Sequence, residues 1–490
     1  MPPIFGVSST PCSHLNRMSI LLPIKMILRK TVVQNEGAAM KLVVTIAVGL
    51  RQKDVAQLPA LKSMQAEGSS APIKPTLPAV TTSVQATYLT GKTPAEHGIV
   101  GNGWYHRDTR EIRFWLQSRS LIGKPTLIDE LQGDGYRVAN LFWWYNMGSD
   151  ARWSLTPRPE YPADGQKIPS VYGEPADLPV RMQQELGTFP LFDFWGPRAG
   201  ITSTRWIVDS ALKLAEDEDP DVMLVYLPHL DYDDQRYGPD SPEALKSRQE
   251  LNTELSRLLD GCREKGAEMM VLSEYGIEKV DSPVFPNRVL ADAGELDVQV
   301  TSHGDLLDVH RSRAFAVCDH QLAHIYIRHS EDLSRIKNLL KQTEGVARVV
   351  DGKELEEIGL NHPRSGELVL ISEPGHWFAY PWWNDDRRAP DYARTVDIHR
   401  KPGYDPAELL LDPQLTFPKL KIASKILARK LGFRNLLDVI STDPSRVRGS
   451  HGRSLEDPEQ GPVMVRSWRA SEDALHAEDV FGEIIRRVRG

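Results

Sequence analysis

A run of hydroxyl side chains at residues 81–83, followed by a glycine-punctuated segment containing Asn102, is the part of this sequence best suited to chemistry. The run follows Pro-Ala-Val, so a hydroxyl can begin a helix, where free backbone N–H groups and the helix dipole favour an anionic phosphate. Asn102 could donate a hydrogen bond to a phosphate oxygen as charge develops there. We therefore expect Thr81, or alternatively Thr82, to be a phosphoryl-transfer nucleophile, although an ordinary N-cap and two turns would use the same residue types.

The spacing of residues 78–105 resembles the nucleophile region of the alkaline phosphatase superfamily, most closely its nucleotide pyrophosphatase/phosphodiesterase branch. That motif places a Thr ten residues before the Gly of a TG pair and then reads PxxHGIxxN. Thr81 and Gly91 keep the interval. The remaining motif positions are matched by Pro94, His97, Gly98, Ile99 and Asn102.

Three later segments resemble the same superfamily in the expected order. Residues 222–240 look like its strand followed by DxxGHxxGP, residues 269–277 like a strand ending in SDHG, and residues 449–465 like its final HG motif and a strand. The resemblance runs from about residue 41 to 465. It implies an α/β fold, a mostly parallel sheet flanked by helices, and hydrolysis of phosphate esters or diesters by a Thr nucleophile.

The resemblance also implies two divalent metals, usually zinc, held by six side chains. Two of these positions match outright: Asp231 and His451. Four positions differ from the family pattern: Val48, Gln235, Glu274 and Tyr275.

These four replacements change the expected metal chemistry. Val48 cannot ligate a metal, whereas Glu274 keeps a carboxylate and Gln235 keeps a carbonyl oxygen. The set moves from nitrogen toward oxygen ligands, which would favour Mg, Mn or Ca over Zn. A site that holds one metal and a site that holds none are both alternatives to the two-metal site.

Two other Asp and His pairs could fill the gaps in the ligand set. Asp319 lies beside His320, and Asp397 lies two residues before His399, which would place the latter pair on one face of a strand. The alternative for each pair is a hydrogen-bonded structural role in or beside a turn.

The elements that must position these groups follow an α/β pattern. Residues 42–50 form a nearly continuous apolar, β-branched run, typical of a buried parallel strand, and residues 222–227 and 269–273 repeat it. Residues 204–218 have helical spacing. Ligands of such sheets bind beyond the carboxyl ends of the strands, where Asp231, Glu274 and the Thr81 turn should converge.

The sequence predicts a core domain over residues 40–470 with a C-terminal tail over 471–490 that ends in a short amphipathic, basic helix. Residues 142–200 are rich in aromatic residues and Pro, and are expected to form an irregular inserted lobe. Its aromatic side chains would either stack on a substrate or fill the lobe's own core: Trp143, Trp144, Tyr145 and Trp195. Residues 1–39 are expected to be a disordered extension, whose apolar run at 18–28 is too short to span a bilayer.

Composition limits the classes of function that this chain can have. A formal net charge of -8 argues against a general nucleic-acid-binding surface. Three scattered cysteines form no disulfide framework, and no cleavage site follows the apolar run at 18–28, so we expect a cytoplasmic protein. Because that run is too short to span a bilayer, we expect no transmembrane segment. The expected ligand is a small phosphate ester or diester. A non-catalytic relative that binds a phosphorylated or aromatic metabolite, and a phosphomutase or transferase, are the alternatives.

Overall fold

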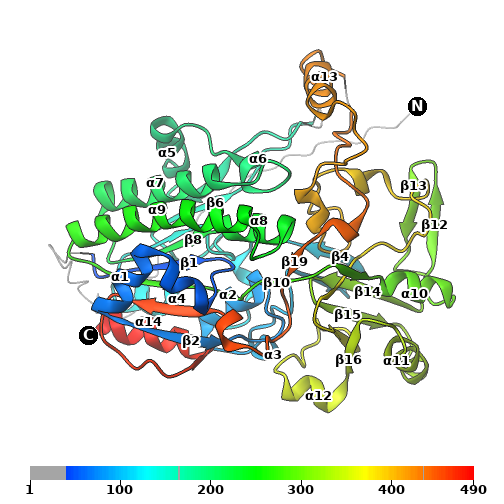
Figure 1. Ribbon diagram of the computed structural model, residues 1–490, viewed down its shortest axis with the longest axis horizontal. Helices are drawn as coiled ribbons and strands as arrows, with labels where there is room; N and C mark the ends of the chain where they lie inside the picture. Colours follow the sequence, from blue (N-terminus) through cyan, green and yellow to red (C-terminus); the bar gives the residue numbers. More distant parts are fainter. Residues whose placement is uncertain (1–39, 164–165, 434) are drawn as a thin grey trace, which may run out of the picture. The chain divides into compact units, whose positions relative to one another are not determined.

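The computed structural model describes residues 40–163, 166–433 and 435–490 (Figure 1). The predictions for residues 1–39 lie outside the described residues.

A nine-stranded sheet forms the centre of the fold, in the order β21-β2-β20-β9-β1-β8-β5-β6-β7. Strands β1, β8, β9, β5 and β6 run parallel; β20 pairs antiparallel with β9 and β2, and β7 pairs antiparallel with β6. The strands are β1 (Leu42–Ala47), β2 (Ser69–Lys74), β5 (Val138–Leu141), β6 (Trp153–Pro157), β7 (Val171–Glu174), β8 (Val222–Leu227), β9 (Glu268–Leu272), β20 (Val463–Arg466) and β21 (Leu475–His476). The expected mostly parallel α/β sheet is confirmed.

The three central strands are apolar because both faces of the sheet are covered. Every residue of β1 and β8 is buried, as continuous apolar runs predict for parallel strands. Leu42 of β1 lies opposite Val222 of β8 on one side and Glu268 of β9 on the other. The carboxyl ends of these strands therefore meet at one edge.

Helices accompany this sheet. They are α1 (Pro59–Glu67), α2 (Thr81–Thr90), α3 (Pro94–His97), α4 (Leu127–Gly133), α5 (Leu178–Leu186), α6 (Leu191–Phe194), α7 (Ile201–Glu218), α8 (His229–Tyr237), α9 (Pro242–Glu264) and α14 (Asp479–Arg489). The predicted helix at 204–218 lies within α7. The predicted C-terminal helix is α14, whose Val480 and Ile484 are buried, and β21 pairs with β2. Residues 471–490 are thus integrated into the sheet and its helices.

A second, antiparallel sheet has the order β14-β15-β17-β16, formed by β14 (Ala314–Asp319), β15 (Leu322–Ile327), β17 (Leu368–Ser372) and β16 (Val346–Val350). It has its own hydrophobic core, together with α10 (Pro286–Asp292) and α11 (Leu333–Lys341). The remaining named strands pair two by two: β3 (Gly103–His106) with β4 (Glu111–Phe114), β10 (Glu278–Lys279) with β19 (Gly449–Ser450), β11 (Ser282–Val284) with β18 (His376–Phe378), and β12 (Val298–Thr301) with β13 (Gly304–Leu307). The sequence did not anticipate the second sheet.

The segment 142–200, expected to be irregular, contains β6, β7, α5 and α6. Its strands are short and end the sheet at one edge, where proline is tolerated. Trp143 and Tyr145 are buried in the main core, as in the core-filling alternative. Trp195 is only partly buried and packs against Tyr404.

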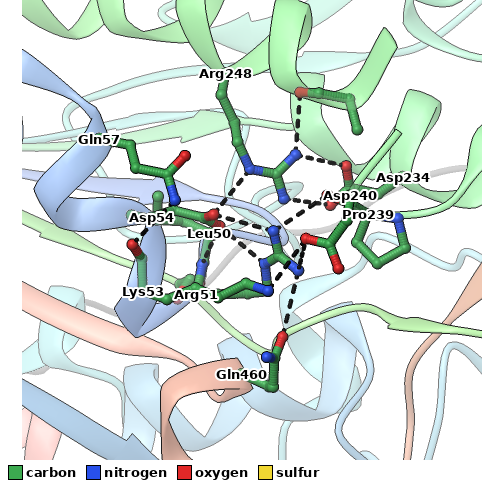
Figure 2. Close-up of polar contacts among 12 residues, drawn as sticks. Leu50, Arg51, Lys53, Asp54, Gln57, Asp234, Pro239, Asp240, Arg248 and Gln460 are labelled. Atoms are coloured by element: carbon green, nitrogen blue, oxygen red, sulfur yellow. Dashed lines mark hydrogen bonds and ion pairs between the residues drawn. The ribbon is translucent and has the colours of Figure 1, made fainter. Parts of the chain in front are cut away.

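A buried ionic network joins the end of β1 to α8 and α9 (Figure 2). Arg248 of α9 contacts both carboxyl oxygens of Asp234 at 2.9 and 3.0 Å, and its Nε lies 3.0 Å from Asp54. Arg51 holds the same Asp54 through Nε and Nη2, each at 3.0 Å. Burial alone would raise the pKa of Asp54, but the two guanidinium groups hold it below its ordinary value. Since α8 also carries Asp231 and Gln235, the network helps to position those side chains.

Replacement of Arg248 by Met should lower the free energy of unfolding by about 3 to 5 kcal/mol, because it leaves Asp234 buried without its cation. The matched control is Arg263→Met on the same helix, which breaks only exposed pairs and should cost at most about 1 kcal/mol. Chemical denaturation measures both variants. Equal losses in the two would contradict the positioning of α8 by this network.

The imidazole of His97 connects α2 to the turn after α3. Its Nε2 lies 3.1 Å from Thr87 Oγ1, and its Nδ1 accepts a hydrogen bond from the backbone N–H of Ile99 at 3.0 Å. Burial, with the nearby His362 and Arg364, lowers the pKa of His97 to about 3. The folded protein therefore keeps this ring neutral.

The unfolded chain takes up a proton on His97 near its ordinary pKa of 6.5, so the folded state should lose stability as the pH falls from 6.5 toward 3. At pH 5 the loss from this one group should be on the order of 2 kcal/mol. The variant His97→Asn, which keeps an acceptor for Ile99, should flatten that part of the profile. An unchanged slope between pH 6.5 and 5 in urea titrations of the variant would refute this account.

Candidate active site

Helix α2 presents Thr81 at the edge where the parallel strands end. The helix begins at Thr81 after an extended Val80 and ends at Gly91, whose φ of 63° suits glycine. Thr81 is only 4% exposed, and its Oγ1 lies 3.0 Å from the hydroxyl of Tyr275. The hydroxyl of Tyr226 on β8 also interacts with it. The predicted helix start is confirmed.

Thr82 is held differently. Its hydroxyl donates a 2.7 Å hydrogen bond to the carbonyl of Gly101, and its backbone N–H donates to Asn102 Oδ1 at 3.1 Å. The Thr82 hydroxyl is therefore committed to a backbone partner, whereas that of Thr81 faces ionisable side chains.

Asn102 and Asp319 form a two-point pair. The backbone N–H of Asn102 donates to Asp319 Oδ2 at 2.7 Å, and its side-chain Nδ2 donates to Oδ1 at 3.0 Å. Burial raises the pKa of Asp319 to about 7, although these two bonds oppose the rise. The structure thus uses this carboxyl, at the end of β14, to hold Asn102, whose amide keeps one further N–H.

Asp231 and His451 face each other. Asp231 lies in the first turn of α8, directly after β8, and its Oδ1 is 3.9 Å from His451 Nε2. His451 Nδ1 lies 2.8 Å from the carbonyl of Ala79, which can only accept, so Nδ1 carries the ring proton and Nε2 presents a lone pair. Both facing atoms are buried without a hydrogen-bond partner. Burial raises the pKa of Asp231 to about 7 and lowers that of His451 to about 3.

Glu274 follows β9 at the same edge. Its Oε1 accepts a 2.6 Å hydrogen bond from Gln85 Nε2, and the Gln85 oxygen accepts one from the backbone N–H of Trp144 at 2.7 Å. The other oxygen, Oε2, is buried without a partner. Burial raises the pKa of Glu274 well above its ordinary value, and the charge of Asp231 adds to the rise.

Aromatic rings stack around His451. The Tyr275 ring lies parallel to it at 3.5 Å between centroids, and His320 packs on it at 3.6 Å. His320 also stacks on Tyr404, whose hydroxyl donates to Gln235 Oε1 at 3.0 Å. These contacts fix the two imidazoles and the amide. The Gln235 side-chain nitrogen, four residues after Asp231 on α8, is buried without a hydrogen-bond partner.

The structure does not bring all the candidate ligands together. His320 Nδ1 lies 3.3 Å from Ser450 Oγ, within the stack. Asp397 and His399 do not lie on a strand; Asp397 pairs with Arg400, and His399 Nδ1 lies 3.3 Å from the carbonyl of Phe114. Turn residues and Pro402 follow them, so the strand that would align them does not form.

The two-metal set implied by the resemblance does not fit these side chains. Val48 is fully buried and offers no donor, and the Tyr275 hydroxyl is bonded to Thr81. Among the described residues, no three His, Cys, Asp or Glu side chains are grouped to hold a metal. Asp231 and His451 are two unpartnered acceptors 3.9 Å apart, and they are the side chains that would hold a single ion.

Sequence reasoning missed Gln85, Tyr226 and Tyr404. Gln85 is a buried polar residue four positions after Thr81, so the two share a helix face, and that spacing was a readable signal. Tyr226 interrupts an otherwise aliphatic strand. Tyr404 gives no comparable signal, because its place beside Gln235 depends on the tertiary fold.

The sequence also matches known proteins. Residues 42–405 match the sequence model of the type I phosphodiesterase / nucleotide pyrophosphatase family. Human ectonucleotide pyrophosphatase/phosphodiesterase family member 7 is 22% identical over 70% of this chain and 69% of its own. An uncharacterized pyrophosphatase/phosphodiesterase of Schizosaccharomyces pombe is 24% identical over 47% of this chain; the match spans 42% of that protein, less than half its length.

Two groups of solved structures share the fold. Phosphonoacetate hydrolase from Sinorhizobium meliloti, in complex with phosphonoformate, superposes with a TM-score of 0.59 at 18% identity, over 92% of this chain and 96% of that one. Murine ectonucleotide pyrophosphatase / phosphodiesterase 5 gives 0.57 at 13% identity, over 92% and 95%. The expected enzyme class, a phosphodiesterase- or phosphatase-type hydrolase, agrees with the family's name. The chain belongs to the type I phosphodiesterase / nucleotide pyrophosphatase family, within the alkaline phosphatase superfamily.

Proposed function

We propose that this protein hydrolyses a small phosphate ester or diester with Thr81 as the nucleophile. The position of the Thr81 hydroxyl carries the proposal: it begins α2, is buried, and lies 3.0 Å from Tyr275, whose ring stacks on His451. Free N–H groups at a helix start favour a phosphate there. The hydroxyl of the competing nucleophile, Thr82, instead donates a hydrogen bond to the carbonyl of Gly101.

The charge of the site supports a need for one divalent cation. Asp231 and Glu274 are buried carboxyl groups, and among the described residues their contacts include no Lys or Arg. An anionic phosphate beside them would meet repulsion unless protons or a cation compensate. Asp231 and His451 would hold that ion, with Gln235 as an oxygen donor and Glu274 nearby. When bound, it would neutralise phosphate charge and lower the effective pKa of a bound hydroxyl or water.

The residues of the chain then have distinct roles. Thr81 Oγ1 attacks phosphorus, the ester oxygen leaves, and a phosphothreonine forms that water later cleaves. Tyr275 and Tyr226 hold the attacking oxygen. Asn102, fixed by Asp319, directs its remaining amide N–H at the charge that develops on phosphate.

The isosteric change Thr81→Val should lower turnover of an aryl phosphodiester at least about a thousandfold, since no other hydroxyl takes its place. Thr82→Val is the matched control and should keep most of the activity, because it removes only a bond to Gly101. Steady-state rates with bis(p-nitrophenyl) phosphate measure both. The reverse pattern would transfer the nucleophile to Thr82, and full activity in both variants would exclude this mechanism.

The purified chain, stripped with a chelator and reloaded, should bind about one divalent ion, and Asp231→Asn and His451→Ala should each lose it. Elemental analysis gives the stoichiometry, and reloading should raise the unfolding free energy by about 2.7 kcal/mol at a hundredfold excess over Kd. Affinities measured for Zn, Mn and Mg then show whether the site prefers Zn, which favours nitrogen ligands, or Mn and Mg, which favour oxygen ligands. Two ions per chain would contradict a single site.

The non-catalytic alternative rests on Val48 and Tyr275, which remove two family ligands. It predicts metal-free protein that binds a phosphorylated or aromatic metabolite without turnover. A phosphomutase or transferase would instead show transfer of phosphate to an acceptor in place of release to water.

A further inference from the structure

Helix α13 (Pro418–Lys430) is coloured orange in Figure 1. Several apolar side chains of this helix and of the residues around it are exposed. In the described part of the chain, fourteen large apolar residues are exposed, and half of them lie within residues 417–436. They are Phe417, Leu420, Ile426, Leu427, Leu431, Phe433 and Leu436, with exposed fractions between 43% and 69%. A concentration of this kind marks an interaction surface.

Local signals make this segment a regular helix. Pro418 occupies the first position, where its missing N–H costs nothing. Gly432, with φ of 87°, ends it, and the N–H of Phe433 donates to the carbonyl of Ala428 at 3.0 Å. The apolar side chains are thus displayed on an ordered scaffold.

The inward contacts of α13 are polar. Lys421 Nζ donates to the carbonyl and carboxyl oxygens of Asp438 at 2.7 and 3.0 Å, and Lys425 donates to the carbonyl of Leu436 at 2.6 Å. Leu420 and Leu427, seven residues apart, share another face and are 68% and 58% exposed. The helix therefore turns an apolar stripe outward, the opposite of a helix that packs on its own core.

The charged residues of this segment are all basic. Residues 416–437 contain no Asp or Glu and six basic residues: Lys419, Lys421, Lys425, Arg429, Lys430 and Arg434. The whole chain carries -8. Basic residues interleaved with exposed Phe and Leu are what an interfacial membrane helix requires, whereas a nucleic-acid surface needs no apolar stripe.

We propose that residues 417–436 form a docking surface for an anionic lipid bilayer, on which α13 lies in the plane of the headgroups. Its apolar stripe enters the headgroup–acyl boundary, and the basic side chains other than Lys421 and Lys425, which pair with Asp438, bind lipid phosphates. The helix has 13 residues, fewer than the roughly 20 that span a bilayer. Consistently, no helix among the described residues is long and apolar enough to cross a membrane.

The test is sedimentation of the full chain with vesicles of phosphatidylcholine, with and without phosphatidylglycerol. We expect binding only to the anionic vesicles, weakening as salt rises. The triple variant Leu420→Ser, Leu427→Ser, Leu431→Ser should bind at least about tenfold more weakly. The control Val180→Ser, Leu245→Ser, Val300→Ser removes three exposed apolar residues elsewhere, with exposed fractions of 43% to 67%, and should bind as the native chain does.

Absence of binding by the native chain, or equal loss in both triple variants, would overturn the proposal. Sedimentation velocity without lipid provides the other decisive outcome. If the native chain self-associates through residues 417–436, so that the stripe variant alone becomes monomeric and vesicles bind neither, the surface is an interface between copies of the chain. Circular dichroism confirms that each variant is folded.

Discussion

The parallel pairing of β1 with β8 on one side and β9 on the other is the constraint on which the site depends. Because three neighbouring strands run the same way, the residues after each of them reach one edge: Val48 after β1, Asp231 after β8 and Glu274 after β9. Helix α2 brings the Thr81 hydroxyl to the same place. No local sequence signal would assemble these four segments without the sheet.

Burial then decides the chemistry of this edge. Asp231 and Glu274 are removed from water without a cationic partner among the described residues, so their carboxyl groups favour the neutral form unless a cation arrives. The same burial keeps His451 neutral, with its free lone pair directed at Asp231. Burying two carboxyl groups in this way costs free energy, and the proposed cation would offset that cost.

The replaced family positions are mutually consistent in the structure. Val48, where the resemblance implies a carboxylate, is buried in the core, and Tyr275, where it implies an imidazole, stacks on His451 and bonds to Thr81. In the structure these two positions therefore provide packing and a hydrogen bond. The buried network of Arg51, Asp54 and Arg248 holds α8 through Asp234, and the same helix brings Asp231 to face His451.

By itself, the sequence determined the family, the parallel α/β core and the helix that starts at Thr81, because these are carried by short motifs and apolar runs. The tertiary structure alone decided which polar side chains meet. Asp319 holds Asn102 across 217 residues, and Tyr404 reaches Gln235 across 169. Asp397 and His399 were additional ligand candidates in the sequence but bond elsewhere. Side-chain contacts between distant segments depend on how the two sheets pack. Local secondary-structure propensity does not encode that packing.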